Sequence, residues 1–263
     1  MSIPPDSGAD SDWPPLDERL VTPGTRYEML DGELIYVPPA DGPHGTRHAQ
    51  LAAVLEAHVT ADFQVAVDML TRTSKTSDIA PDASVFPRGP HPVTGRRQLD
   101  HLSFEIASTQ TLAYVARKAR SLAARGVRRV FAISIDRKRV LEWSRELDAW
   151  TMLDPASAIA DPALAVPLPI AALAHAIRAE DVMSDALRAK RTPAFLAERD
   201  EGRIEGRIDA IAAAVIAVLT ARALPLADDQ RAAILAERDL GRLERWLARA
   251  VTCARVADLL VAD

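Results

Sequence analysis

The fold is decided by residues 101–136, which read HLSFEIASTQTLAYVARKARSLAARGVRRVFAISID. Apolar side chains alternate with others from Leu102 to Ala107, which is the pattern of a β-strand. From Thr111 the apolar residues recur at helical spacing until Gly126, which occupies the position of a left-handed helix C-cap. A second apolar strand follows. Strand, helix and strand within about 35 residues predict a βαβ unit whose two strands are parallel.

Glu105 interrupts the first of these strands. The alternation sends the apolar residues to one face of the sheet and Glu105 to the opposite face. Lys118 lies on the flank of the apolar stripe of the following helix. We therefore expect its methylene groups to be buried and its ammonium group to reach a groove beside the helix. Asp82, in the strand-like run IAPDASVF, can face the same groove if the two strands are neighbours.

Two carboxylates and an ammonium group on neighbouring elements suit metal-assisted hydrolysis of a phosphodiester. Mg²⁺ prefers oxygen ligands and keeps several waters, so two acids and a backbone carbonyl suffice. The cation lowers the pKa of a bound water, and a nearby lysine stabilises the charge that develops on the phosphate. The pattern alone favours a structural interpretation: the acids lie on solvated strand faces and the lysine only covers apolar surface.

The rest of the chain predicts an α/β domain followed by helices. We expect a turn at Asp31-Gly32, a strand over 33–37, an amphipathic helix over 44–61 and an antiparallel edge strand over 139–146. Two further strand-like runs are FQVAVDMLTRTS and IAPDASVFP, and the Ala- and Pro-rich segment DPASAIADPALAVPLP is predicted to be a linker.

The predicted division is a disordered lead-in over 1–18, a nuclease-like domain over 19–170 and a helical extension over 171–263. The extension contains an Ala-rich helix and then three shorter amphipathic helices. Helices this short are marginal alone, so they should pack on each other, on the core or on a second copy of the chain. We therefore predict a homo-oligomer formed through the extension.

The net charge, the cysteine count and the length of the apolar runs exclude several classes of protein. The formal net charge of −5 over 263 residues argues against a general nucleic-acid coat protein, although basic side chains are concentrated over 117–139. The single cysteine, Cys253, excludes an intramolecular disulfide and a cysteine-based zinc cluster. The longest apolar run, residues 210–219, is too short to span a bilayer, and the proline-rich start has no leader pattern. These features predict a cytoplasmic protein.

Five segments carry a family resemblance, and they occur in this order: DGELIYVPP, HGTRHAQLAAVLEAHV, APDASVF, FEIAS and RKARSLAARGVRRVFAISIDRKRVLEW. Their order and spacing resemble the Uma-two family of restriction endonucleases, within the PD-(D/E)XK nuclease-like superfamily. The likeness covers residues 26–169. It implies an α/β (α+β) fold with a mixed sheet flanked by helices, followed here by the all-helical extension. It also implies Mg²⁺, with Mn²⁺ as the alternative, and DNA as substrate.

The resemblance implies roles residue by residue. Asp82 matches the motif aspartate and Glu105 the first acid of the E-X-K element, while Ala107 stands where the strand lysine is usual. Lys118 matches a lysine on the helix. Asp82, Glu105 and the Ile106 carbonyl are the implied metal ligands.

Further candidates are weaker matches. Glu33 matches an acid that could help to hold metal, and His44 matches a histidine at the start of the first long helix. Tyr114 stands where the family often has an acid, one turn before Lys118. The proposed phosphate contacts are Arg96, Arg97, Arg117, Arg120 and Arg125.

Two alternatives stay open. One is a non-catalytic interaction module that keeps the nuclease fold and acts through its helical tail, because fold does not fix function. The other is an RNA-directed nuclease with the same site. The histidines His48, His58, His91 and His101 show no ligand spacing that suggests a site, and Trp143 and Trp150 are expected to pack at a sheet edge.

Overall fold

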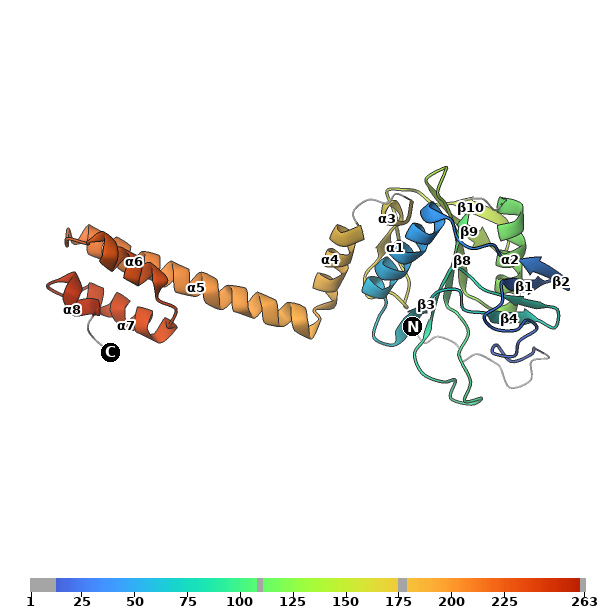
Figure 1. Cartoon of the computed structure of the whole chain (residues 1–263), viewed down its shortest axis with the longest axis horizontal. Coiled ribbons are helices and arrows are strands. Elements are labelled where there is room, and N and C mark those ends of the chain that lie inside the picture. Colours follow the sequence, from blue (N-terminus) through green and yellow to red (C-terminus); the bar gives the residue numbers. More distant parts are fainter. Residues whose placement is uncertain (1–12, 108–110, 175–178, 261–263) are drawn as a thin grey trace. The chain divides into compact units, whose positions relative to one another are not determined.

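The computed structural model describes residues 13–107, 111–174 and 179–260. The chain divides into two compact units, Met1–Lys190 and Arg191–Asp263 (Figure 1). The helices α3 (Ile170–Ala174) and α4 (Ala179–Lys190) belong to the first unit, whereas the sequence placed the start of the extension at residue 171.

The predicted lead-in is only partly described, because residues 1–12 lie outside the described residues. Residues 13–18 contact the domain. Leu16 is buried and its carbonyl accepts a hydrogen bond of 3.1 Å from the backbone of Arg72.

A six-stranded mixed sheet forms the centre of the first unit. Its strand order is β10-β9-β8-β7-β6-β3, and β7–β8 is its parallel pair. The bounds are β3 (Phe63–Ala66), β6 (Ala83–Pro87), β7 (Leu102–Ala107), β8 (Arg129–Ser134), β9 (Arg139–Ser144) and β10 (Ala149–Met152). Helix α2 (Leu112–Arg125) joins β7 to β8 and ends at Gly126, whose φ of 115° is left-handed. The predicted βαβ unit is therefore confirmed.

Two faces of this sheet are covered by different helices. Phe104 and Ile106 of β7 pack with Leu51 and Leu55 of α1 (Gly42–His58), whereas Ala107 packs with Val115 of α2. The odd-numbered residues of β7 therefore face α2. Glu105 lies on that face, opposite the main apolar set, as the alternation predicted.

A smaller four-stranded sheet lies beside the first. Its order is β2-β1-β5-β4, with bounds β1 (Tyr27–Leu30), β2 (Glu33–Tyr36), β4 (Thr71–Ser74) and β5 (Ser77–Ile79). The predicted turn at Asp31-Gly32 joins β1 to β2, and both residues have positive φ (54° and 84°). Residues 80–82 cross from β5 of the small sheet to β6 of the large one, and this crossing positions Asp82.

Two sequence predictions are corrected here. FQVAVDMLTRTS is not one strand but two, β3 and β4 in different sheets, broken near Asp68, which has a φ of 51°. The strand β9 is antiparallel to β8 as predicted, but β10 pairs on its outer side, so β9 is not the edge. Trp143 and Trp150 pack edge to face across this pair, with ring centroids 5.1 Å apart.

The predicted linker over 154–169 is part of the core. Its strands β11 (Ala158–Ile159) and β12 (Leu168–Pro169) pair with each other. Ile159, Leu164 and Leu168 are buried with the side chains of the large sheet. A few apolar residues spaced among Pro and Ala are enough to dock a segment, because each buried leucine or isoleucine contributes about 1.5–3 kcal/mol.

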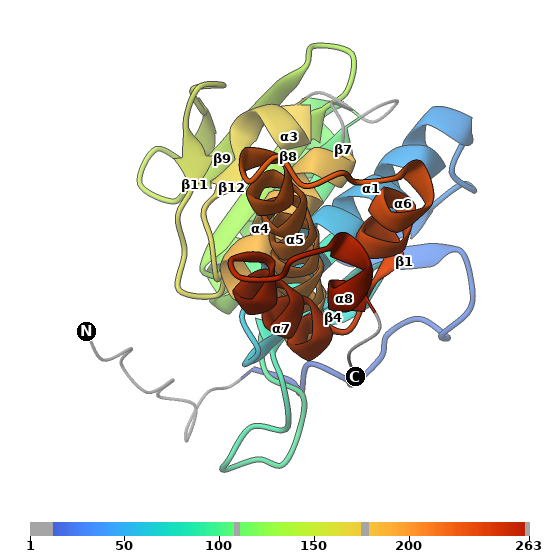
Figure 2. The same ribbon diagram turned by 90° about the vertical axis from the view of Figure 1, so that its left-hand side faces the viewer.

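The second unit is helical, as predicted. A long helix, α5 (Pro193–Ala221), is followed by α6 (Asp228–Ala236), α7 (Leu240–Ala250) and α8 (Val256–Leu260). Helices α6 and α7 pack against α5, and α8 packs against α6 and α7 (Figure 2). Their shared core includes Val215, Leu219, Leu243 and Trp246. Oligomer formation through this unit stays a prediction. In the described part of the chain, no helix is both long and apolar enough to cross a membrane.

Candidate active site

Lys118 lies inside the first unit. Its side chain is 3% exposed, and its Nζ lies 2.9 Å from Glu105 Oε2. The ammonium group also donates to the Ala80 carbonyl at 2.8 Å and lies 3.4 Å from Glu28 Oε1. Burial alone lowers the pKa of Lys118, but the carboxylates of Glu105 and Glu28 reverse this, so the pKa lies above its usual range. The lysine is therefore a charged group at the centre of a buried cluster, not a boundary residue as predicted.

Glu105 is buried on β7 with only part of its hydrogen-bonding capacity used. Oε2 pairs with Lys118, whereas Oε1 is buried and has no hydrogen-bond partner among the described residues. Burial raises the pKa of Glu105 well above its usual value; Asp82 and Glu28 add to this and Lys118 opposes it. A buried carboxylate oxygen without a donor is costly, so Oε1 marks a position that can accept a cation or a further donor.

Asp82 connects this cluster to helix α1. It directly precedes β6, whose Ala83 pairs with Phe104 of β7, so Asp82 lies beside the Glu105 segment. Asp82 Oδ2 accepts a hydrogen bond from the Ile106 backbone amide. Burial alone would raise the pKa of Asp82, but His44, His48, Lys118 and the Ile106 amide outweigh it, and the pKa lies below its usual range. Asp82 is thus an ionised carboxylate.

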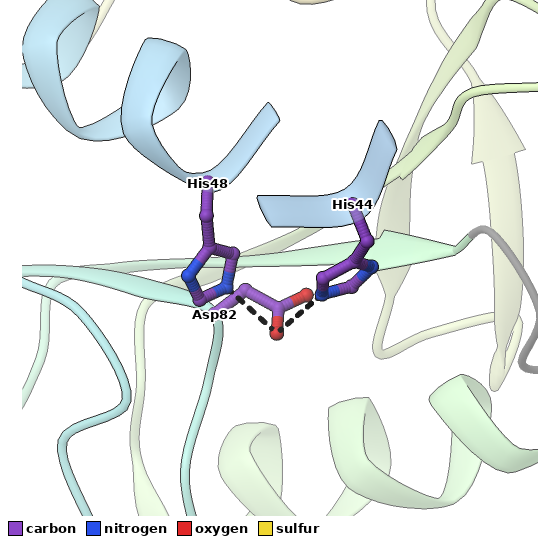
Figure 3. Close-up of side chains that lie close together, drawn as sticks. All are labelled: His44, His48 and Asp82. Atoms are coloured by element: carbon purple, nitrogen blue, oxygen red, sulfur yellow. Dashed lines mark ion pairs between the residues drawn. The ribbon is translucent and has the colours of Figure 1, made fainter. Parts of the chain in front are cut away.

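Two histidines of α1 face Asp82. His48 Nε2 lies 3.0 Å and His44 Nε2 3.7 Å from Asp82 Oδ1 (Figure 3). They are one helical turn apart, which places both rings on the same face of α1. The helix begins here because Asp41 caps it, accepting a hydrogen bond of 2.9 Å from the His44 amide. The adjacent Asp82 carboxylate raises the pKa of His48, and burial partly opposes it.

Sequence reasoning named His44 but set His48 aside. The i, i+4 spacing of the two histidines was a usable signal, because that spacing places two imidazoles together on one helical face. The two imidazole nitrogens and an Asp82 oxygen all lie within 4.8 Å of one another.

Glu28 and Tyr114 complete the buried cluster, and Glu28 was also missed. Glu28 Oε1 accepts a hydrogen bond of 3.0 Å from the Ala80 amide, and Oε2 accepts one of 3.3 Å from the Tyr114 hydroxyl. Burial and the nearby Glu28 raise the pKa of Tyr114 to about 12. An acid beside Lys118 is therefore present, but it comes from β1 instead of the helix. The available signal was period-two alternation, which places Glu28 on the same strand face as buried Leu30.

Glu33 lies elsewhere. It is exposed on β2 and forms an ion pair of 2.9 Å with Arg117, and none with Lys118 among the described residues. The predicted phosphate-contacting arginines also have intramolecular partners. These are Asp17 for Arg96, Asp100 for Arg97, Asp31 and Glu33 for Arg117, Asp148 for Arg120, and the carbonyls of Arg72 and Pro14 for Arg125.

The donors at this site fit a divalent cation. Asp82 is ionised, Glu105 has a buried oxygen without a partner, and Lys118 is the only cation that the described contacts place against Glu105. The Ile106 amide fixes the Asp82 carboxylate; the predicted role of the Ile106 carbonyl as a ligand stays a prediction.

Comparison with known proteins gives one family. The model of the Uma2 (Uma-two) family, described as "Putative restriction endonuclease", matches residues 13–169. A similar solved structure is described as a putative nuclease belonging to DUF820 from Anabaena variabilis ATCC 29413. It is 19% identical, with a TM-score of 0.46 over 61% of this chain and 91% of that chain. No curated protein matches.

Proposed function

The chain belongs to the Uma2 family, and from that premise we propose that it is a metal-dependent endonuclease that hydrolyses DNA phosphodiester bonds. One observation carries the proposal. A buried, charged Lys118 holds one oxygen of Glu105, while the other oxygen has no partner among the described residues and lies in the same cluster as the ionised Asp82. Buried charge arranged this way costs stability and is typical of functional sites.

The two carboxylates are the proposed cation ligands. Asp82, Glu105 and the Ile106 carbonyl would hold Mg²⁺, with Mn²⁺ as the alternative, because both accept carboxylate and carbonyl oxygen. When bound, the cation lowers the pKa of a coordinated water and neutralises charge on the phosphate. The Ile106 amide already fixes Asp82, so this ligand is oriented before a cation arrives.

Lys118 acts through Glu105. Its ammonium group is buried, so its first effect is to oppose the rise in the pKa of Glu105 that burial causes and to orient the carboxylate. The Ala80 carbonyl and Glu28 hold the ammonium group in place, and Tyr114 holds Glu28. Such preorganisation avoids the cost of reorienting charges during reaction.

Substrate approaches from the side of Asp82, His44 and His48, whose side chains are 15–16% exposed, whereas Glu105 is 1% exposed. His44 belongs to the site through Asp82. Arg96, Arg117 and Arg120 are the exposed candidates for phosphate contact, because a phosphate can replace their surface acids. Arg97 and Arg125 are weaker candidates for phosphate contact, and Glu33 is a weaker candidate for holding metal.

The test is cleavage of supercoiled plasmid and of single-stranded DNA by purified wild-type protein with Mg²⁺, with Mn²⁺ and with chelator. We expect metal-dependent nicking that falls about 100-fold or more in Asp82→Asn. The matched control is Asp62→Asn, because Asp62 is an exposed acid of the same unit. Nicking that survives chelator or Asp82→Asn contradicts the proposal, and cleavage of RNA alone assigns the same site to RNA.

A further inference from the structure

We propose that His44, His48 and Asp82 form a second cation position that prefers nitrogen ligands and takes a divalent transition metal of the Fe²⁺, Co²⁺, Ni²⁺ and Zn²⁺ group ahead of Mg²⁺. It lies on the imidazole side of Asp82, where the first turns of α1 meet the crossing between the two sheets. Glu105, which pairs with Lys118, is not a member of this group of ligands.

The separations between the donor atoms suit one cation. Imidazole nitrogen and carboxylate oxygen bind such metals at about 2.0–2.2 Å, so two ligands of one cation lie about 3.0 Å apart at a right angle and about 3.4 Å apart in a tetrahedron. Asp82 Oδ1 lies 3.0 Å from His48 Nε2 and 3.7 Å from His44 Nε2. Adjustments of a few tenths of an ångström therefore bring each imidazole nitrogen to a ligand's separation from Asp82 Oδ1, and the donor atoms all lie within 4.8 Å of one another.

The donor types decide which ion is preferred. Imidazole nitrogen suits iron, nickel and zinc, whereas Mg²⁺ takes oxygen ligands and gives up its waters reluctantly. Both rings present Nε2 to the same carboxylate oxygen (Figure 3). Two imidazoles and one carboxylate leave further coordination positions for water or substrate, as in open catalytic sites.

The three ligands are held in position by other parts of the chain. The Ile106 amide fixes the second oxygen of Asp82, and the Asp41 cap fixes the start of α1 at His44. His48 Nε2 is buried and, although close to Asp82, directs no hydrogen bond of acceptable geometry to any described residue. A metal ion would give this nitrogen a full partner. Asp68 Oδ1, 3.8 Å from the same nitrogen, adds negative charge on the open side.

This inference shares Asp82 with the proposed nuclease site but does not depend on cleavage, because cation binding is measured directly. The protein must carry no polyhistidine tag. Titration calorimetry with Co²⁺, Zn²⁺ and Mg²⁺ gives affinities, and the visible absorption of bound Co²⁺ reports nitrogen ligation. The variants are His44→Gln and His48→Gln, with His91→Gln, in the loop after β6, as the matched control.

We expect Co²⁺ and Zn²⁺ to bind at least about tenfold more tightly than Mg²⁺, and to lose at least about tenfold in affinity in His44→Gln and in His48→Gln but not in His91→Gln. Circular dichroism checks that each variant is folded. If His48→Gln unfolds, the wild-type protein is treated instead with diethyl pyrocarbonate, which modifies histidines, with and without Co²⁺. Bound Co²⁺ should protect His48. Full modification of His48 in the presence of Co²⁺ overturns the proposal.

Equal affinity for Co²⁺ and Mg²⁺, or Co²⁺ binding insensitive to both histidine substitutions, overturns the second cation position. Histidine-dependent Co²⁺ binding without DNA or RNA cleavage supports it and contradicts only the proposed nuclease. Mg²⁺-dependent cleavage without histidine-dependent binding of Co²⁺ supports the proposed nuclease and contradicts the second cation position.

Discussion

Glu105 and Asp100 are two carboxylates of the first unit that are equally buried, each 1% exposed, and differently bonded. Asp100 Oδ1 accepts from Arg97 at 2.8 Å, and Oδ2 accepts from Thr71 at 3.1 Å and Ser84 at 3.4 Å. Glu105 has Lys118 on one oxygen and, within the part of the chain that the structure describes, no hydrogen-bond partner on the other. Burial raises the pKa of both carboxyl groups.

The difference separates a structural carboxylate from one that keeps binding capacity. A buried carboxylate with both oxygens bonded stabilises the local fold, because its charge is compensated. One with an oxygen left over is costly for the fold, and natural proteins keep such groups mainly at functional sites. The variants below probe this contrast through the free energy of unfolding and through DNA nicking.

Lys118→Met should have the largest effect on stability. It removes the cation between Glu105 and Glu28 and leaves two buried acids without a counter-charge, so we expect a loss of about 3–5 kcal/mol in the free energy of unfolding. Urea unfolding followed by circular dichroism measures this. The double variant Lys118→Met/Glu105→Gln should recover part of the loss. A loss below about 1 kcal/mol in the single variant contradicts the buried ion pair.

Asp100→Asn should have an intermediate effect. It removes the charge opposite Arg97, whose side chain is 16% exposed and can still reach water. We expect a loss of about 1.5–3 kcal/mol, typical of hydrogen bonds to charged groups. Because Asp100 has no part in the proposed chemistry, nicking per folded molecule should equal that of wild type well below the melting temperature. A loss of nicking per folded molecule in Asp100→Asn would contradict the assignment of Asp100 to structure and Glu105 to function.

Tyr114→Phe should have a small effect. The hydroxyl donates one hydrogen bond, of 3.3 Å, to Glu28 Oε2, and the ring itself is kept. We expect a loss of about 0.5–1.5 kcal/mol in the free energy of unfolding. Nicking should fall by less than it does in Lys118→Met, because Tyr114 reaches Lys118 only through Glu28. Nicking as low as in Lys118→Met would mean that the hydroxyl has a direct role.

The central part of the fold could be predicted because its signals are local. The change of period between residues 102 and 134 fixed β7, α2 and β8, and the alternation within β7 placed Glu105 on the face toward α2. The Gly126 cap was equally readable. Lys118 was assigned to the correct helix, but the burial of its side chain depends on other elements that pack over it, which the local pattern does not show.

The remainder depended on contacts between distant parts of the chain. Glu28 approaches Lys118 from 90 residues away, and no local pattern shows that the β1–β2 hairpin closes the groove. Residues 154–169 carry Pro and Ala at loop-like density, so the docking of Ile159 and Leu168 became visible only in the core. His48 is a different case: its spacing from His44 was visible, but only the position of Asp82 gives that spacing a meaning.

The most direct measurement is plasmid nicking by Glu105→Gln in Mn²⁺, with the free energy of unfolding determined on the same preparation. The substitution keeps the size of the side chain and removes a buried negative charge. We expect nicking to fall about 100-fold or more, while the free energy of unfolding falls by less than in Lys118→Met, because Glu28 and the Ala80 carbonyl still hold the ammonium group. Nicking at the wild-type rate by a fully folded Glu105→Gln protein would contradict the assignment of this carboxylate to the chemistry.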